Sequence, residues 1–142
     1  MLQVRYLYHL SNIECDIISL NLSEDLKFTP KKDNVLEAIS KGIFFEISYA
    51  NLMDTMKRRR LIKNGRYLTS ICEGKNLIIT SEVDDYIKHK SPLEVKTISS
   101  LFGIKQEYIH KALTDNCKVL LHNASKILST SIENKRMSVM SK

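Results

Sequence analysis

The residues of this chain best suited to chemistry are a run of lysines and arginines near its middle. Six cations fall within ten positions, and no acidic residue occurs between Thr55 and Cys72. A surface of one charge sign attracts a polyanion such as a nucleic-acid backbone. The candidate binding residues are Lys57, Arg58, Arg59, Arg60, Lys63 and Arg66.

A helix is the element that would position these cations. Leu61, Leu68 and Cys72 recur at helical spacing, which predicts a helix from about Thr55 to Cys72 with one apolar face. Helical geometry then places Arg59, Lys63, Arg66 and Ser70 on the opposite face, with Arg58 and Arg60 flanking it. An ordinary solvated face would also carry charge, but it usually mixes the two signs.

Apolar runs on both sides of this helix predict two strands. They cover residues 43–48 and 76–80, and a strand–helix–strand unit implies a parallel sheet. A third strand is expected at 16–22, before a helix that Asp33 would cap and Gly42 would end. Glu46 lies in an otherwise apolar strand, so we expect it to be paired or open to water. Gly65 would let the basic helix pack closely on the sheet.

Helices are also predicted before and after the region of the strands. A helix is expected over residues 2–12, and another begins at Pro92 with Ser91 as its N-cap. After Gly103 a further helix starts at Lys105 or Gln106 and ends at Asn116, with a last helical piece over 119–122. From Ser125 the composition favours a loose segment. We therefore divide the chain into residues 1–124 and a flexible basic tail, 125–142.

Composition restricts the class of protein. The chain has 142 residues, a formal net charge of +6 and a sequence pI of about 9.2. It lacks an apolar run of about 18 residues, so neither a membrane span nor a membrane partner is expected, and its start does not resemble a secretory signal. Cys15, Cys72 and Cys117 form no CxxC pair, which favours reduced thiols in an intracellular protein over a disulfide or zinc framework.

Motifs for catalysis are absent from the sequence. The four histidines are isolated, and no HExxH, GxSxG, Walker loop or GxGxxG occurs. Nothing singles out a Cys–His nucleophile pair. The sequence thus predicts binding chemistry with no catalytic residue, no metal site and no cofactor.

A second binding motif competes with the basic helix. Residues 92–116 form a helix, a glycine-containing turn and a helix, which is similar to a DNA-reading helix-turn-helix. The second helix would present Gln106, Glu107, His110 and Lys111 to DNA. The alternative is a helical pair that packs on the edge of the sheet.

Several pieces of the chain together resemble a known family, the thirty-kilodalton protein subunit of ribonuclease P and ribonuclease MRP. Their order and spacing agree with that family from about Asp16 to His122. The pieces are Phe45-Glu46-Ile47-Ser48-Tyr49, Arg58-Arg59, Ile71-Cys72, Gly74-Lys75-Asn76-Leu77-Ile78-Ile79, Ser91-Pro92-Leu93-Glu94-Val95, Leu101-Phe102-Gly103-Ile104, and residues 114–121 with Asn116-Cys117.

Two departures from the family pattern matter. The family usually has Gly-Pro-Tyr-Asp where this chain has Ser91-Pro92-Leu93-Glu94, and the first half of the family's barrel has no counterpart here. The resemblance implies an α/β fold that is the C-terminal part of a TIM-like (PHP-like) barrel, with about three parallel strands. Because three strands cannot close a barrel, we expect a truncated product, a partner that completes the sheet, or poor solubility.

The resemblance also implies a function. It predicts a non-catalytic, RNA-binding subunit of ribonuclease P, and possibly of ribonuclease MRP, in which the RNA carries the catalysis. Its partners would be the ribonuclease P or MRP RNA, precursor tRNA and other protein subunits, in the nucleus and nucleolus, with roles in tRNA 5′-leader and rRNA processing. Two alternatives stay open: a metal-dependent PHP-type phosphoesterase, and a helix-turn-helix DNA-binding protein.

Overall fold

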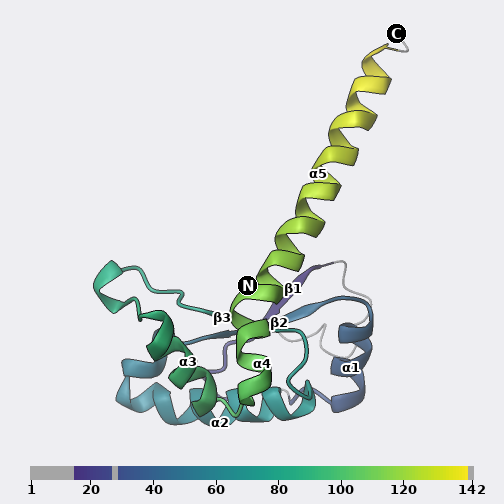
Figure 1. Cartoon of the computed structure of the whole chain (residues 1–142). Coiled ribbons are helices and arrows are strands. Elements are labelled where there is room, and N and C mark those ends of the chain that lie inside the picture. The colour runs from purple at the N-terminus through teal and green to yellow at the C-terminus, as the bar shows by residue number, and fades with distance from the viewer. Residues whose placement is uncertain (1–14, 27–28, 141–142) are drawn as a thin grey trace.

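A small parallel sheet with helices packed against it forms the body of the protein (Figure 1). The structure is a computed structural model that describes residues 15–26 and 29–140. Strands and helices alternate as β1 (Ile17–Ser19), α1 (Lys32–Ser40), β2 (Phe44–Ser48), α2 (Thr55–Ile71) and β3 (Leu77–Thr80). The three strands are parallel and lie in the order β1-β2-β3. The parallel α/β arrangement predicted from the sequence is therefore confirmed, whereas the helix expected over residues 2–12 lies outside the described residues.

One face of the sheet carries the hydrophobic core. Phe45 pairs with Leu77 and Ile47 with Ile79, and all four side chains are buried. Residues of α1 and α2 belong to the same core cluster, so both crossover helices pack on this one face. The helices α3 and α4 and the segments next to them contribute Ile98, Phe102, Ile104, Ile109 and Ala112 to it.

The second face of the sheet mixes apolar and polar side chains. Phe44 and Ile78 are buried there, although they are not part of the core cluster. Glu46 lies on this face in the middle strand and is half-buried, paired in register with Ser19 and Ile78. Its carboxylate is thus partly open to water, as expected for a charged group in an apolar strand.

The ends of α1 confirm one prediction and correct another. Gly42 follows the helix with φ +84°, a backbone conformation that glycine adopts without strain, so it ends α1 as predicted. Asp33, however, is not the N-cap. The N-cap is Lys31, without a side-chain hydrogen bond, and Asp33 lies in the first turn, where its charge favours the positive end of the helix dipole.

The helix α2 begins where a carboxylate caps it. Asp54 accepts hydrogen bonds from the backbone N–H groups of Met56 (2.8 Å) and Lys57 (3.1 Å). Gly65 permits close packing, but its neighbour is not the sheet. A Cβ added there would lie 2.6 Å from Cδ1 of Phe102, which is fully buried after α3. The glycine therefore makes room for an aromatic ring.

The helix α3 (Pro92–Leu101) starts as the sequence predicted. Ser91 caps the backbone N–H of Glu94, and Glu94 accepts a hydrogen bond from the N–H of Ser91 in return. Gly103 then turns the chain with φ +78° into α4 (Gln106–His110). Two short 3₁₀ turns, Ala50–Met53 and Tyr86–Lys88, precede α2 and α3.

The prediction that Asn116 ends a helix is wrong. A π-helical stretch, Lys111–Asp115, joins α4 to α5 (Asn116–Met140), and the Asn116 amide donates a 2.7 Å hydrogen bond to the Leu77 carbonyl. The structure also has helix through residues 125–140, where a loose segment was expected. In Figure 1, α5 extends away from the body. No helix in the described part of the chain combines the length and the hydropathy required to cross a membrane.

Candidate functional site: the cationic face of α2

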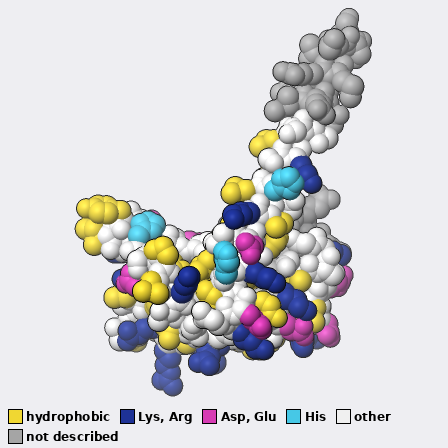
Figure 2. All heavy atoms as spheres, viewed as in Figure 1, with side chains coloured by type: hydrophobic (Ala, Val, Ile, Leu, Met, Phe, Trp, Pro, Cys, Tyr) yellow, Lys and Arg dark blue, Asp and Glu magenta, His cyan; other side chains and the backbone are white. Residues whose placement is uncertain are grey.

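The structure divides the six predicted cations into two groups. Arg58, Arg59, Arg60, Lys63 and Arg66 are exposed, and Lys57 is half-buried. In Figure 2, dark blue Lys and Arg side chains gather along the lower edge of the body, where Figure 1 places α2. The two groups differ in whether a described carboxylate lies nearby, and not in exposure: Lys57 and Arg60 have one, and the other four cations do not.

One side of α2 is held by the segment that follows β1. Lys57 lies 3.8 Å from a Glu24 oxygen, and Nε of Arg60 donates a 3.0 Å hydrogen bond to Asp25. Further along, the Asn64 amide donates to the backbone carbonyls of Leu22 and Glu24, at 2.9 and 3.0 Å. These contacts give Lys57 and Arg60 an intramolecular role, although such exposed ion pairs contribute only about 0–1 kcal/mol each.

The other four cations form the surface that we call the cationic stripe, which consists of Arg58, Arg59, Lys63 and Arg66. No described carboxylate lies within 4.0 Å of any of them. From Arg59 to Arg66 the stripe runs along about 10 Å of helix. Arg58 is exposed and so does not pack inward. The stripe can attract an anion without first breaking an ion pair.

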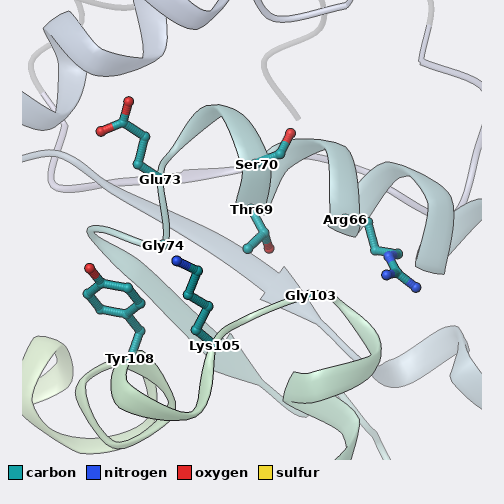
Figure 3. Close-up of a pocket in the computed structure, with 8 residues that line it drawn as sticks. All are labelled: Arg66, Thr69, Ser70, Glu73, Gly74, Gly103, Lys105 and Tyr108. Atoms are coloured by element: carbon teal, nitrogen blue, oxygen red, sulfur yellow. The ribbon is translucent and has the colours of Figure 1, made fainter.

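A hollow of about 460 Å³ continues the stripe beyond Arg66 (Figure 3). It lies between α2 and the turn that joins α3 to α4. Its lining comes from three places in the sequence: Arg66, Thr69 and Ser70 from α2, Glu73 and Gly74 from the turn after α2, and Gly103, Lys105 and Tyr108 from the α3–α4 region. The hollow is therefore a product of tertiary packing.

Among the described residues, one carboxylate lines the hollow, that of Glu73, and it is already neutralised. Glu73 pairs with Lys32 at 3.0 Å and with Lys75 at 3.3 Å. The hydrogen bonds from Lys32 and Lys75 lower the pKa of Glu73, so it is ionised at neutral pH and balanced by two ammonium groups. Figure 3 shows its carboxylate directed away from Lys105. The hollow remains suited to an anion.

Sequence reasoning missed this part of the site. It predicted Lys105 only as a possible first residue of a helix, and it gave Thr69 no role. The one available signal was that Thr69 and Ser70 follow Arg66 by three and four positions, which are neighbouring positions on a helix. No local pattern could bring Lys105 to them, because it lies 39 residues after Arg66.

The alternatives to a binding surface gain little from the structure. Among the residues that it describes, no group of three or more His, Cys, Asp or Glu side chains could hold a metal ion. Burial raises the pKa of the Cys72 thiol to about 12, so that thiol is protonated at neutral pH and is a poor nucleophile.

The helix-turn-helix alternative is only partly matched. Its predicted reading face, Gln106, Glu107, His110 and Lys111, is exposed. However, Ile109 and Ala112 pack into the same core as the sheet. The pair α3–α4 is thus part of the α/β body and does not form a separate three-helix unit.

The fold and the site together define the class of the protein. It is an α/β protein in which both crossover helices pack on one face of a parallel sheet and one of them, α2, presents cations at the surface. The family model described as RNase P subunit p30 matches residues 6–127. The chain therefore belongs to the RNase P subunit p30 family, as the resemblance in its sequence predicted.

Individual proteins are similar to this chain over most of its length, and two of the three that follow carry ribonuclease P names. The chain is 31% identical over 124 residues to ribonuclease P protein subunit p30 of Mus musculus, covering 84% of this chain and 46% of that protein. It is 32% identical over 114 residues to probable ribonuclease P protein subunit 3 of Schizosaccharomyces pombe, covering 79% and 48%. It is also 34% identical over 115 residues to protein GAMETOPHYTE DEFECTIVE 1 of Arabidopsis thaliana, covering 80% and 20%. The chain thus spans about half or less of the length of these relatives.

Proposed function

We propose that this chain acts as a protein subunit of ribonuclease P and that the cationic stripe of α2 binds RNA. The ribonuclease P names of its relatives in Mus musculus and Schizosaccharomyces pombe support the role as a subunit. The observation that carries RNA binding is the cationic stripe itself, four exposed cations without a described carboxylate within 4.0 Å. Phosphate contacts of this kind supply the sequence-independent part of nucleic-acid affinity.

Neutralising two residues of the stripe tests the proposal. Arg59→Gln combined with Lys63→Gln removes two phosphate-binding cations and keeps two polar side chains of helix-forming type. We expect weaker binding of a precursor tRNA and a salt dependence, log Kd against log salt, that is shallower by roughly 0.7–0.9 for each cation removed. Fluorescence anisotropy between about 50 and 200 mM salt measures both quantities.

A matched pair of substitutions on the same helix provides the control. Lys57→Gln combined with Arg60→Gln removes the same charge from residues that are paired with Glu24 and Asp25. This control pair should reduce the slope less than the stripe pair does. Unchanged affinity and slope in the stripe variant would show that these side chains only solubilise α2.

We also propose how this subunit and the RNA share the work of the ribonucleoprotein. Catalysis would be carried by the RNA of the ribonucleoprotein, and this chain would contribute binding to that RNA, to precursor tRNA and to other protein subunits, with no cofactor. Membership of ribonuclease MRP and a role in rRNA processing extend the same proposal. We propose the nucleus and nucleolus as the location of this function.

We infer, finally, that the sheet is part of a TIM-like barrel. Two features support this inference: the strands follow in sequence order, and both crossover helices pack on one face. Barrels wind in this way, whereas doubly wound sheets reverse their strand order and carry helices on both faces. Further strands would then pair with the free edges of the three-stranded sheet.

A further inference from the structure

We propose that the hollow beside α2 is a phosphate subsite for RNA, in which one phosphodiester group sits over Thr69, between Arg66 and Lys105. This inference rests on the proposed function, because it extends the cationic stripe onto a second part of the fold. It assigns a binding role to residues outside the six cations that the sequence indicated.

The cations of the hollow come from opposite sides of it. Arg66 is the last residue of the cationic stripe, and its stem lies against Gly103, where an added Cβ would be 3.8 Å from Arg66 Cγ. Lys105 is exposed on the α3–α4 turn, with no described carboxylate within 4.0 Å. Figure 3 shows Arg66 at one end of the hollow and Lys105 with Tyr108 at the other. A single anion between them would meet positive charge from both sides.

A buried hydroxyl lies between these cations. Thr69 is only 6% exposed, lines the hollow, and has no hydrogen-bond partner for its Oγ1. An unsatisfied buried hydroxyl destabilises the fold, and a helical threonine has two accessible χ1 rotamers. Rotation of Thr69 would bring its hydroxyl to a phosphate oxygen. The Ser70 hydroxyl, in contrast, already donates to the Tyr67 carbonyl at 2.7 Å and would have to give up that bond to reach a phosphate.

The surroundings of Tyr108 favour a phosphate over a stacked base. The Lys111 ammonium lies 5.8 Å above the ring centroid. Gly74 lies so close that a Cβ there would be 2.9 Å from Cδ2 of the ring. These neighbours crowd the ring, so Tyr108 serves as a wall of the hollow. The two cations at the ends of the hollow favour an anion as its occupant.

Two substitutions in the full chain, Lys105→Gln and Thr69→Val, test this subsite separately from the stripe. Lys105→Gln should weaken RNA binding and lower the salt slope by the equivalent of one phosphate, roughly 0.7–0.9. The matched control is Lys96→Gln, an exposed lysine of α3 that does not line the hollow, which should leave both unchanged. Equal effects of the two lysine variants would overturn the subsite.

Thr69→Val tests the hydroxyl without changing the charge. Removing an unpartnered buried hydroxyl should leave the thermal stability unchanged or raise it, whereas the absence of a donor to phosphate should weaken RNA binding several-fold. A purely structural threonine would change only the melting temperature, and that result contradicts its assigned role. If Arg59→Gln with Lys63→Gln weakens binding while Lys105→Gln and Thr69→Val do not, the stripe binds RNA and the hollow does not. If none of them has an effect, both proposals fail.

Lysine acetylation read by mass spectrometry identifies the source of the phosphate. RNA should protect Lys105 but not Lys96 from acetylation, and more strongly than inorganic phosphate does at matched ionic strength. Protection by inorganic phosphate with none by RNA would assign the hollow to a small free anion and overturn the assignment to RNA.

Discussion

Single residues decide how closely α2 can approach the rest of the body. Gly65 is the clearest case, because the Phe102 ring occupies the space in which a side chain would lie. Glycine lowers helix stability by about 1 kcal/mol relative to alanine, so in an isolated helix its replacement would be favourable. The buried ring reverses that expectation.

We expect Gly65→Ala to destabilise the protein despite the gain in helix propensity. Its Cβ would lie 2.6 Å from Phe102 Cδ1, and overpacking of this kind costs about 1–3 kcal/mol. Urea unfolding followed by circular dichroism measures the change. In a Phe102→Leu background the same substitution should cost less, because the smaller side chain leaves space. An equal cost in both backgrounds would mean that the ring is not the obstacle.

Among the elements, α3 shows how a few polar groups set the start of a helix. Ser91 and Glu94 exchange hydrogen bonds of 2.8 and 3.3 Å, and Pro92 occupies the first helical turn. Two hydrogen bonds from Ser91 lower the pKa of Glu94 below the usual 4.5. The bond from the backbone N–H has the larger effect, and the bond from the side chain has the smaller one. The helix α3 in turn positions the Gly103 turn that borders the hollow.

This capping box makes part of the stability pH-dependent. Because the folded state lowers the pKa of Glu94, its carboxylate stabilises the fold above the ordinary pKa, and the contribution is lost as the pH falls through the lowered value. Urea unfolding from pH 7 to about pH 3 should therefore show a smaller loss of stability in Glu94→Gln than in the wild type. Ser91→Ala should lower stability by about 1 kcal/mol at neutral pH. Parallel pH profiles for Glu94→Gln and wild type would contradict this account.

On the scale of the whole molecule, the core and the long C-terminal helix are separate features. Between residues 113 and 130 no residue is buried, and residues 121–130 are all exposed. The helix α5 is anchored at its start, where Asn116 donates to the Leu77 carbonyl. Its far part extends from the body and adds nothing to the described core (Figure 1).

Deleting residues 125–142 should therefore leave folding intact, which tests the predicted boundary at residue 124. Thermal unfolding should stay cooperative, with a melting temperature within about 3 °C of the full chain. Asn116→Ala is the control, because it removes a half-buried hydrogen bond and should lower stability by about 1–3 kcal/mol. A larger loss of stability in the truncated chain than in Asn116→Ala would show that the far part of α5 belongs to the folding unit.

The sequence by itself determined the local elements and the sign of the surface. Nearly continuous apolar runs specified β2 and β3, and helical spacing specified the inner face of α2. Ser91 and Gly42 marked helix ends. Each of these signals depends on neighbours a few positions away. The cations of α2 were equally predictable, because helical spacing alone places most of them on the face opposite the apolar one or beside it. The pieces that resemble the family also lie within such local segments.

Only the tertiary structure decided which cations of α2 have a carboxylate partner and which distant residues lie beside the cationic stripe. The segment after β1 folds back and neutralises Lys57 and Arg60, and no spacing in the sequence indicates that contact. Asn116, a common helix terminator, instead bonds to β3 and lets the helix continue. Lys105 reaches the end of α2 through a turn far along the chain. These ion pairs of α2 and the hollow arise from groups that are distant in sequence, so they are determined by packing and not by local pattern.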